Sequence, residues 1–353
     1  MNSNNTATNE ANRESTHFMV YSPDPLLQKY FQKDSYFFQP REGGMNNTTF
    51  FVEAGTERFV LRIYETHKDF NKVSYEHYIL SELAKLELFI KTPVPVTGQD
   101  NKTVQFTEDG KPAALFHYID GVTPGFENPI QLKSFGMAAG GLLNALGSIE
   151  SKLKPVYRPY YELENTHPEC PLHKVISFCE RPSSEFDKYR SELLEVAAQL
   201  MTFRERAASF KMLPHQLIHG DLNASNVLAD TEGNISAILD FEFVTEDLRI
   251  MELCVCLSEI INMKQEEAEL WGKLKAFIEG YGKHVRLHRT EADVVPVLIM
   301  LRRLDVFVHF LGRYWEGIDS KEILLDQTKN IVAQAQWLNV NRESLMSLIE
   351  LLL

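Results

Sequence analysis

The first third of the chain alternates apolar and polar residues with the two-residue period that is typical of half-buried strands. Residues 48–53 and 58–64 are predicted to form two such strands, joined by a turn at Gly55. Two further strands are expected at 103–107 and 113–119, on either side of a Glu-Asp-Gly-Lys turn. This part of the chain therefore predicts a small antiparallel sheet.

The rest of the chain has the longer apolar spacing of amphipathic helices. Val73, Ile79 and Leu83 recur at helical positions within residues 72–88, and Pro93 follows that helix. Beyond Gly121 helices dominate, and they are expected at about 129–150, 185–210, 247–263, 266–285, 290–315 and 321–352. A β-rich first third followed by a helical remainder predicts an α+β fold with two lobes.

The boundary between the two lobes is expected near residues 118–121. A small N-lobe with the sheet and one helix would occupy residues 17–118, and a larger helical C-lobe would occupy residues 119–353. A length of 353 residues suits two lobes better than one compact core. Residues 1–16 are mostly Asn, Thr, Ser and Glu, so we expect a disordered tail there.

Composition and charge exclude several classes of function. A formal net charge of −13 argues against a general nucleic-acid binder, because phosphate backbones require clustered Lys and Arg. No apolar run approaches the roughly 20 residues needed to cross a bilayer, and the four cysteines form no CxxC pair. We therefore expect a cytoplasmic protein with no nucleic-acid or membrane partner. The sequence HPECPLH at 167–173 is interpreted as a proline-containing loop, because a structural zinc usually needs four ligands.

The most informative segment is LIHGDLNASNVLADTEGNISAILDFEF, residues 217–243. His219, Asp221 and Asn226 match the H-x-D-x-x-x-x-N spacing of a kinase catalytic loop. Asp240 stands 19 residues after Asp221, at the end of an apolar, β-branched run. The apolar runs on either side of a polar turn predict a hairpin that brings the two halves together.

Phosphoryl transfer explains why these residue types are needed. Catalysis of this reaction depends mainly on positioning and on neutralising charge. Asp221 is expected to orient the acceptor hydroxyl and accept its proton, while Asn226 and Asp240 supply oxygen ligands to Mg²⁺. Taken alone, either half could be turn residues or a strand cap. The occurrence of both halves around one hairpin favours the catalytic interpretation.

The segment resembles that of the superfamily of aminoglycoside phosphotransferases, choline kinases and type II homoserine kinases, and is closest in character to the last of these. Members carry HGDxxxxN followed by a DFE-like or DW-like segment, and the resemblance extends over residues of about 35–320. It implies a protein-kinase-like fold, ATP or GTP as phosphoryl donor, and Mg²⁺. It also implies that Asp221 is the catalytic base and that Asn226 and Asp240 are the metal ligands.

The resemblance further implies an ion pair in the N-lobe. Arg62, on the strand at 58–64, is expected to reach the α- and β-phosphates and to pair with Glu76 on the following helix. Protein kinases use Lys at that strand position, but the guanidinium fork of Arg also suits phosphate. A surface arginine with no role in binding is the alternative.

Two backbone sites complete the predicted nucleotide pocket. Gly43, Gly44 and Asn46 lie in a hairpin turn that could present N–H groups to phosphate, because Gly and Asn tolerate positive φ. Without its context, this segment is only a hairpin turn. The segment from Leu115 to Gly121 resembles the family's interlobe hinge, which implies that main-chain groups of His117 and Ile119 bind the adenine edge.

The acceptor site is the least specific part of the prediction. By resemblance to choline kinases Glu259 is a candidate for binding an amino group, and Glu242, two residues after Asp240, is another. The late helix resembles that of type II homoserine kinases, which implies that Arg302 or Arg303 could bind a carboxylate. Together these would describe an amino acid such as homoserine. Trp315 could instead contribute to a cation–π wall for choline or ethanolamine. Alternatively, this late helix is simply part of the core and its arginines are solvated.

These observations predict a small-molecule kinase that acts on a homoserine-like substrate or another amino alcohol. A kinase of aminoglycosides, macrolides or amino sugars is an alternative with the same fold. A pseudokinase that acts as a binding module is a third. The expected partners are a nucleotide and a small acceptor, and the chain could be a monomer or a homodimer.

Overall fold

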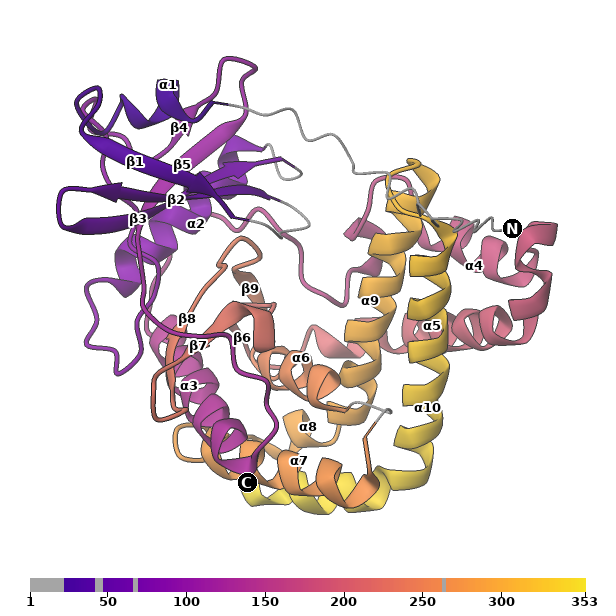
Figure 1. Ribbon diagram of the computed structural model, residues 1–353. Helices are drawn as coiled ribbons and strands as arrows, with labels where there is room; N and C mark the ends of the chain where they lie inside the picture. Colours follow the sequence, from indigo (N-terminus) through magenta and orange to yellow (C-terminus); the bar gives the residue numbers. More distant parts are fainter. Residues whose placement is uncertain (1–21, 42–46, 66–68, 262–264) are drawn as a thin grey trace, which may run out of the picture.

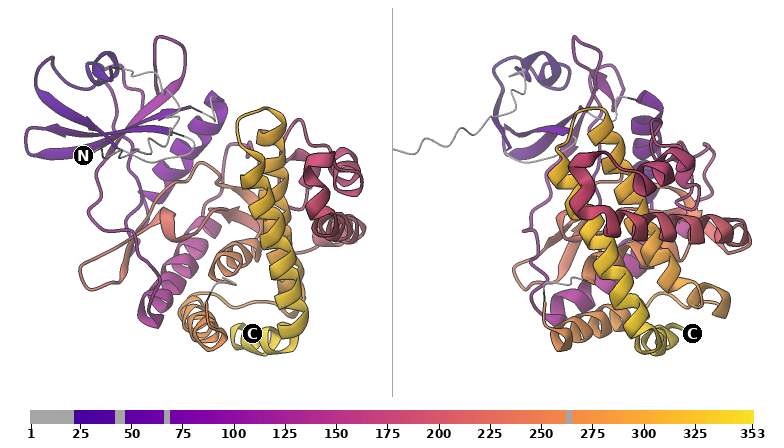
Figure 2. Two further views of the ribbon diagram at one scale, coloured as in Figure 1. Left: turned by 45° about the vertical axis from the view of Figure 1, so that its right-hand side comes forward. Right: turned by 90° about the vertical axis from the view of Figure 1, so that its right-hand side faces the viewer.

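The computed structural model describes residues 22–41, 47–65, 69–261 and 265–353. The predicted disordered tail at 1–16 and the predicted phosphate-loop residues Gly43, Gly44 and Asn46 lie outside these ranges. Figure 1 shows a sheet-containing lobe above a larger helical lobe. In both views of Figure 2 the sheet stays at one end of the molecule. The predicted α+β fold with two lobes is confirmed.

The first lobe is a five-stranded antiparallel sheet with strand order β1-β2-β3-β5-β4. Alternating residues of one strand face the core, so that Phe59, Leu61 and Ile63 are at most 3% exposed. The strands are β1 (Tyr36–Pro40), β2 (Asn47–Ala54), β3 (Glu57–Tyr64), β4 (Gln105–Phe106) and β5 (Pro112–His117). The strands expected at 48–53 and 58–64 are therefore found, each slightly longer than predicted.

Helix α2 (Phe70–Leu83) is the only long helix of this lobe among the described residues. The Asp69 carboxylate caps its N-terminus by accepting from the Asn71 N–H at 2.8 Å. Its inner face carries the predicted apolar residues together with Glu76 and His77, which are also buried. The helix ends before the predicted residue 88, because the chain turns from Ala84 onward.

The chain passes between the lobes along residues 118–128 and is held against the larger lobe by main-chain contacts. Val122 and Ala229 exchange hydrogen bonds of 3.0 and 2.8 Å as an isolated bridge. Gly121 adopts φ 154°, and a Cβ there would lie 2.7 Å from the Cβ of Leu228. This close approach requires glycine.

The second lobe is mainly helical and contains two short two-stranded sheets, β6–β9 and β7–β8. The strands are β6 (His215–Ile218), β7 (Val227–Ala229), β8 (Ile235–Ile238) and β9 (Thr245–Leu248). The helices are α3 (Pro129–Gly147), α4 (Leu172–Glu180), α5 (Arg190–Phe210), α6 (Met251–Ile260), α7 (Glu267–Tyr281), α8 (Arg289–Ala292), α9 (Val295–Trp315) and α10 (Lys321–Ile349). A short helix, α1 (Asp24–Leu27), precedes the first sheet.

Three local features differ from the sequence prediction. The helix expected from residue 247 begins at Met251, because residues 245–248 pair with β6 as a strand. The helix expected at 290–315 is divided into α8 and α9, and Pro296 lies in the first turn of α9. The segment interpreted as a loop continues into α4, which follows Pro171. Across the described ranges no helix is long and apolar enough to span a bilayer.

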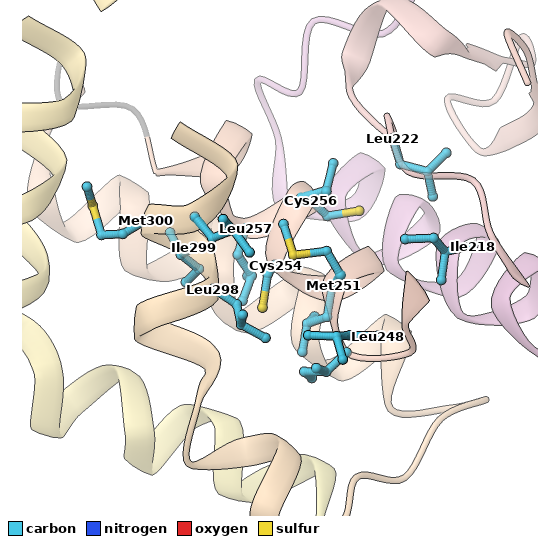
Figure 3. Close-up of a cluster of buried hydrophobic side chains, with 14 of the residues drawn as sticks. Ile218, Leu222, Leu248, Met251, Cys254, Cys256, Leu257, Leu298, Ile299 and Met300 are labelled. Atoms are coloured by element: carbon cyan, nitrogen blue, oxygen red, sulfur yellow. The ribbon is translucent and has the colours of Figure 1, made fainter. Parts of the chain in front are cut away.

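Helix α6 lies at the centre of the C-lobe core. Residues 251–258 are all buried, so this helix is surrounded by other elements on every side. Figure 3 shows Cys254 and Leu257 of α6 near Leu298 and Ile299 of α9, with Ile218 and Leu222 on the other side. This core therefore supports the chain immediately before and after Gly220.

Helices α3 and α7 pack closely because glycines lie at their contact. A Cβ at Gly280 of α7 would lie 2.0 Å from the Lys133 carbonyl oxygen of α3, and one at Gly136 would lie 2.1 Å from the Phe277 carbonyl oxygen. Neither backbone atom can move away independently of its helix. The interhelical distance therefore depends on the absence of these side chains.

We predict that Gly280→Ala lowers the free energy of unfolding by about 1–3 kcal/mol, because the added methyl group forces the two helices apart. Gly272→Ala is the matched control on the same helix, since a Cβ there meets no atom within 4 Å. It should leave stability unchanged or raise it by about 0.5–1 kcal/mol. Denaturant unfolding of both variants checks this, and equal effects would contradict it.

Candidate active site

The β7–β8 hairpin brings the two halves of the 217–243 segment together. Val227 pairs with Ile238, and the Leu239 N–H donates to the Asn226 carbonyl at 2.8 Å. The Nε2 of His219 lies 2.9 Å from the Leu239 carbonyl oxygen, so this ring links the two halves. As the sequence predicted, Asn226 and Asp240 then line the same cavity.

The three polar side chains of this segment have complementary orientations. Asn226 Nδ2 donates to the Asp221 main-chain carbonyl at 2.8 Å and to Asp221 Oδ2 at 3.0 Å. This directs the amide oxygen of Asn226 away from Asp221. Asp240 adopts φ 64°, a left-handed conformation that is uncommon outside glycine. Such strain is typical of functional positions.

Glu252 of α6 holds the catalytic loop through hydrogen bonds to its main chain. Its Oε2 accepts from the main-chain N–H of His219 at 2.5 Å and of Gly220 at 3.4 Å. These two hydrogen bonds hold the main chain of the loop immediately before Asp221. Burial raises the pKa of Glu252 to about 7, although both hydrogen bonds oppose this shift.

Arg62 connects the N-lobe sheet to the hairpin. Its Nη1 lies 2.9 Å from Asp240 Oδ1 and 3.8 Å from Glu76 Oε1. The predicted pair with Glu76 is therefore present, but the shorter contact is with Asp240. Glu76 also accepts from the Tyr64 hydroxyl at 2.9 Å. Burial raises the pKa of Glu76 to about 7, and the charge of Arg62 opposes that shift.

A cavity of about 290 Å³ lies between the lobes, close in size to a typical small-ligand pocket. Arg62, Asn226 and Asp240 contribute polar groups to its lining. The apolar part of the lining comes from both lobes and includes Phe51, Val60, Phe116, Leu228 and Leu239. Such a mixed lining suits a nucleotide, which combines a flat aromatic base with charged phosphates.

The predicted hinge borders the same cavity. The His117 N–H donates to the Val94 carbonyl at 3.1 Å, and the Tyr118 N–H donates to the Arg58 carbonyl at 2.9 Å. His117 can therefore offer only its carbonyl to a ligand. Ile119 also lines the cavity. The role of these main-chain groups in base recognition stays a prediction.

The predicted acceptor residues do not all lie together. Arg302 Nη2 is 2.5 Å from Asp221 Oδ1. Arg303 is directed elsewhere, where it contacts Glu259 at 3.4 Å and donates to the Ser258 carbonyl. Of the two arginines, only Arg302 contacts the predicted base.

Trp315 and Glu242 lie further from the Arg302–Asp221 pair. Trp315 is thirteen residues beyond Arg302 on α9, about 20 Å along a helix, and its ring packs edge-on against Phe178. Glu242 faces the N-lobe, where its Oε2 accepts from Asn47 Nδ2 at 3.4 Å. Burial and the nearby Asp240 carboxylate raise the pKa of Glu242.

Two contributors to the site were not identified from the sequence. The Tyr160 hydroxyl donates to the Gly220 carbonyl at 2.5 Å and accepts from Arg302 Nη1 at 2.9 Å. Asp305 lies 3.6 Å from the same Arg302 nitrogen. Both positions are far from Asp221 in sequence, and neither belongs to a motif that would single it out.

The environment of Asp221 suits a general base. The pKa of Asp221 is raised to about 6, mainly by burial, which the charge of Arg302 opposes and the neighbouring Asp240 and Glu259 carboxylates reinforce. A base with a pKa near the working pH is both available and sufficiently basic to accept a proton.

The oxygen donors fit magnesium. Mg²⁺ is usually held by one or two protein oxygens together with phosphates. The Asn226 amide oxygen and the Asp240 carboxylate provide such a pair, since both residues line the cavity. Within the described part of the chain, no three His, Cys, Asp or Glu side chains form a metal-binding group.

Comparison with known proteins identifies the family. A sequence model of the phosphotransferase enzyme family matches residues 38–288, well over half of the chain. The chain belongs to this family. The resemblance inferred from the 217–243 segment is thus confirmed, and this phosphotransferase is an enzyme of the small-molecule kinase type.

Several relatives and solved structures are similar to this phosphotransferase. A homoserine kinase of Rhodopseudomonas palustris (strain BisB18) is 25% identical over 257 residues, which cover 72% of each chain. A microcompartment-associated aminopropanol kinase has a TM-score of 0.69 at 16% identity, covering 92% of this chain and 97% of that one. The amicoumacin kinase hAmiN has a TM-score of 0.64 at 16% identity, with coverages of 88% and 93%. The two structures show a shared fold.

We predict that Glu252→Gln changes the pH dependence of stability. Because the folded-state pKa of about 7 exceeds the ordinary value of 4.5, the protonated carboxyl stabilises the fold below about pH 4.5, and this contribution is lost as the pH rises through 7. The variant should therefore gain stability relative to the wild type between these values. One pKa unit corresponds to about 1.4 kcal/mol, so the gain is at most roughly 3 kcal/mol.

Denaturant unfolding at several pH values measures this difference. Glu343→Gln on the exposed face of α10 is the matched control for loss of a solvated carboxylate. A difference between Glu252→Gln and wild type that stays constant from pH 4.5 to pH 7 would contradict the assigned environment of Glu252.

Proposed function

We propose that this phosphotransferase transfers the γ-phosphoryl group of ATP, with Mg²⁺, to the hydroxyl of a homoserine-like amino acid or a related amino alcohol. The observation that carries the proposal is the contact between Arg302 and Asp221 at 2.5 Å. It places a carboxylate-binding cation beside the predicted base. The similarity to homoserine kinases, at 25% identity in the example above, supports the same substrate class.

The nucleotide half of the mechanism follows from the cavity. The nucleotide base would contact the apolar side chains from both lobes, and its phosphates would contact Arg62, which lines the same cavity. Mg²⁺, when bound, would neutralise charge on the phosphates. Asn226 and Asp240 would hold it, and Arg62 keeps Asp240 in place through the 2.9 Å ion pair. GTP could occupy the same cavity.

The acceptor half of the mechanism depends on Asp221. Its carboxylate orients the acceptor hydroxyl and accepts the proton as the oxygen attacks the γ-phosphorus and ADP leaves. Arg302 binds the acceptor carboxylate, and Glu259, whose charge acts on both Asp221 and Arg302, binds the amino group. The Glu259 side chain is 35% exposed and also contacts Arg303 at 3.4 Å. Glu242, the other acidic candidate, accepts from Asn47 Nδ2 of the N-lobe instead.

An acceptor screen that measures ADP formation tests this proposal. Homoserine, choline and ethanolamine should be compared with aminoglycosides, macrolides and amino sugars, with ATP and Mg²⁺ present throughout. We expect the highest kcat/KM for homoserine or a close relative. Much faster turnover of an antibiotic would favour the alternative of an antibiotic kinase. Failure to bind nucleotide with Mg²⁺ in calorimetry would favour a pseudokinase.

We predict that Asp221→Asn lowers turnover by roughly 10²-fold or more, because the positioned base is lost. Nucleotide affinity should change little, since Asp221 does not line the nucleotide cavity. Asp230→Asn is the matched control, because this residue lies in the turn of the same hairpin and caps main-chain N–H groups there. Steady-state kinetics with calorimetry separates the two effects, and unchanged turnover of Asp221→Asn would remove this residue from the role.

A further inference from the structure

Both oxygens of the predicted base already accept hydrogen bonds in this structure. Arg302 Nη2 lies 2.5 Å from Asp221 Oδ1, and Asn226 Nδ2 donates to Asp221 Oδ2 at 3.0 Å. A general base must approach the hydroxyl that it deprotonates to within about 2.6–3.2 Å. An acceptor hydroxyl would therefore meet a carboxylate that is paired with a full positive charge.

The Arg302 guanidinium has binding capacity that Asp221 does not use. Its Nη1 donates to the Tyr160 hydroxyl at 2.9 Å, while Asp305 lies 3.6 Å from Nη1, beyond hydrogen-bond distance. Its Nε is buried and has no hydrogen-bond partner among the described residues. The Nε–H and Nη2–H groups form one edge of the planar fork, which can bind a carboxylate through two parallel hydrogen bonds.

We infer that Arg302 is a positioning residue that holds Asp221 until a carboxylate on the acceptor displaces it. A carboxylate that accepts from both Nε and Nη2 replaces the single contact that Asp221 makes with this edge. Asp221 Oδ1 is then free to accept from the hydroxyl of the same acceptor molecule. This inference rests on the proposed function and deepens it, because it gives the acceptor carboxylate a role in turnover as well as in binding.

A second consequence concerns water. In the absence of an acceptor, the base remains paired with Arg302, so it does not activate water for attack on ATP. Transfer to water, which would yield ADP and phosphate, is suppressed until a carboxylate binds. The pairing therefore protects the nucleotide from unproductive hydrolysis.

The adjacent arginine does not share this arrangement. Consecutive helical residues point about 100° apart, and Arg303 is anchored by Glu259 at 3.4 Å and by Gln334 at 3.2 Å. It also donates to the Ser258 carbonyl. These partners all come from α6 and α10. Arg302 alone of the two has a free donor next to the base.

The first test measures ATP hydrolysis without phosphoryl acceptor. The probe is 2-aminobutyrate, which has the carboxylate and amino group of homoserine but no hydroxyl. At about pH 8, well above the ordinary carboxyl range, it should stimulate hydrolysis by the wild type several-fold. Arg302→Gln should hydrolyse ATP several-fold faster than the wild type without any addition and should not respond to the probe. Absence of stimulation in the wild type, or no increase in the variant, would overturn the inference.

The second test compares homoserine with 3-aminopropan-1-ol, which is the same molecule without the carboxylate. In the wild type kcat should be roughly 10²-fold higher for homoserine. With 3-aminopropan-1-ol no carboxylate displaces Asp221 from Arg302, so the base is poorly positioned. In Arg302→Gln this ratio should fall toward one, and Arg302→Lys should restore part of it. Equal loss of kcat with both acceptors in Arg302→Gln, at an unchanged ratio, would instead assign Arg302 a purely structural role.

Arg313→Gln is the matched control for loss of a buried arginine from α9. Arg313 pairs with Asp319 at 2.5 Å, and both side chains are 9% exposed. This variant should keep the wild-type acceptor ratio and hydrolysis rate, with thermal unfolding used to verify folding of all variants. If the wild type phosphorylates neither acceptor, the proposed function fails, and the hydrolysis test still decides whether Arg302 restrains Asp221.

Discussion

Carboxylates that lie close together in a poorly solvated cleft repel one another, and two arginines balance this repulsion in the active site. Arg62 from the N-lobe sheet contacts Asp240 at 2.9 Å and Glu76 at 3.8 Å, while Arg302 from α9 contacts Asp221 at 2.5 Å. Burial raises the pKa of Glu76 and of Asp221, and the charges of Arg62 and Arg302, respectively, oppose that rise. The first pair also joins the two lobes, because Arg62 and Asp240 come from opposite sides of the cavity.

The catalytic loop is held in place by contacts from outside the site. Glu252 binds two main-chain N–H groups of the catalytic loop, and it extends from a helix that is buried on every side. Tyr160 contributes a hydrogen bond to Gly220 from a distant loop. The positions of Asp221 and Asp240 are therefore set mainly by main-chain hydrogen bonds and core packing. The ion pairs with Arg302 and Arg62 then determine which oxygens of Asp221 and Asp240 can contact a ligand.

The sequence predicted the parts of the site that are close together in the chain. The proximity of Asp221 and Asp240 could be predicted from a single hairpin, because turn residues between two apolar strands are a local sequence signal. The roles of Arg302 and Arg303 could not be separated, since the apolar stripe of α9 does not say which polar neighbour faces the cleft. Tyr160 was missed because its contacts depend on packing between distant segments. Residues 167–173 are interpreted from the sequence as a loop, although the last two already belong to α4, in which Leu172 is buried.

The central claim is that Asn226 and Asp240 hold one divalent cation together with the nucleotide, next to Asp221. Electron paramagnetic resonance of Mn²⁺, titrated with a non-hydrolysable ATP analogue, tests it most directly. The account predicts that the wild type binds Mn²⁺ in a nucleotide-dependent way. Asp240→Asn should bind Mn²⁺ much more weakly, because a carboxylate ligand is replaced by a neutral amide. Equal binding of Mn²⁺ and nucleotide in the two proteins would contradict it.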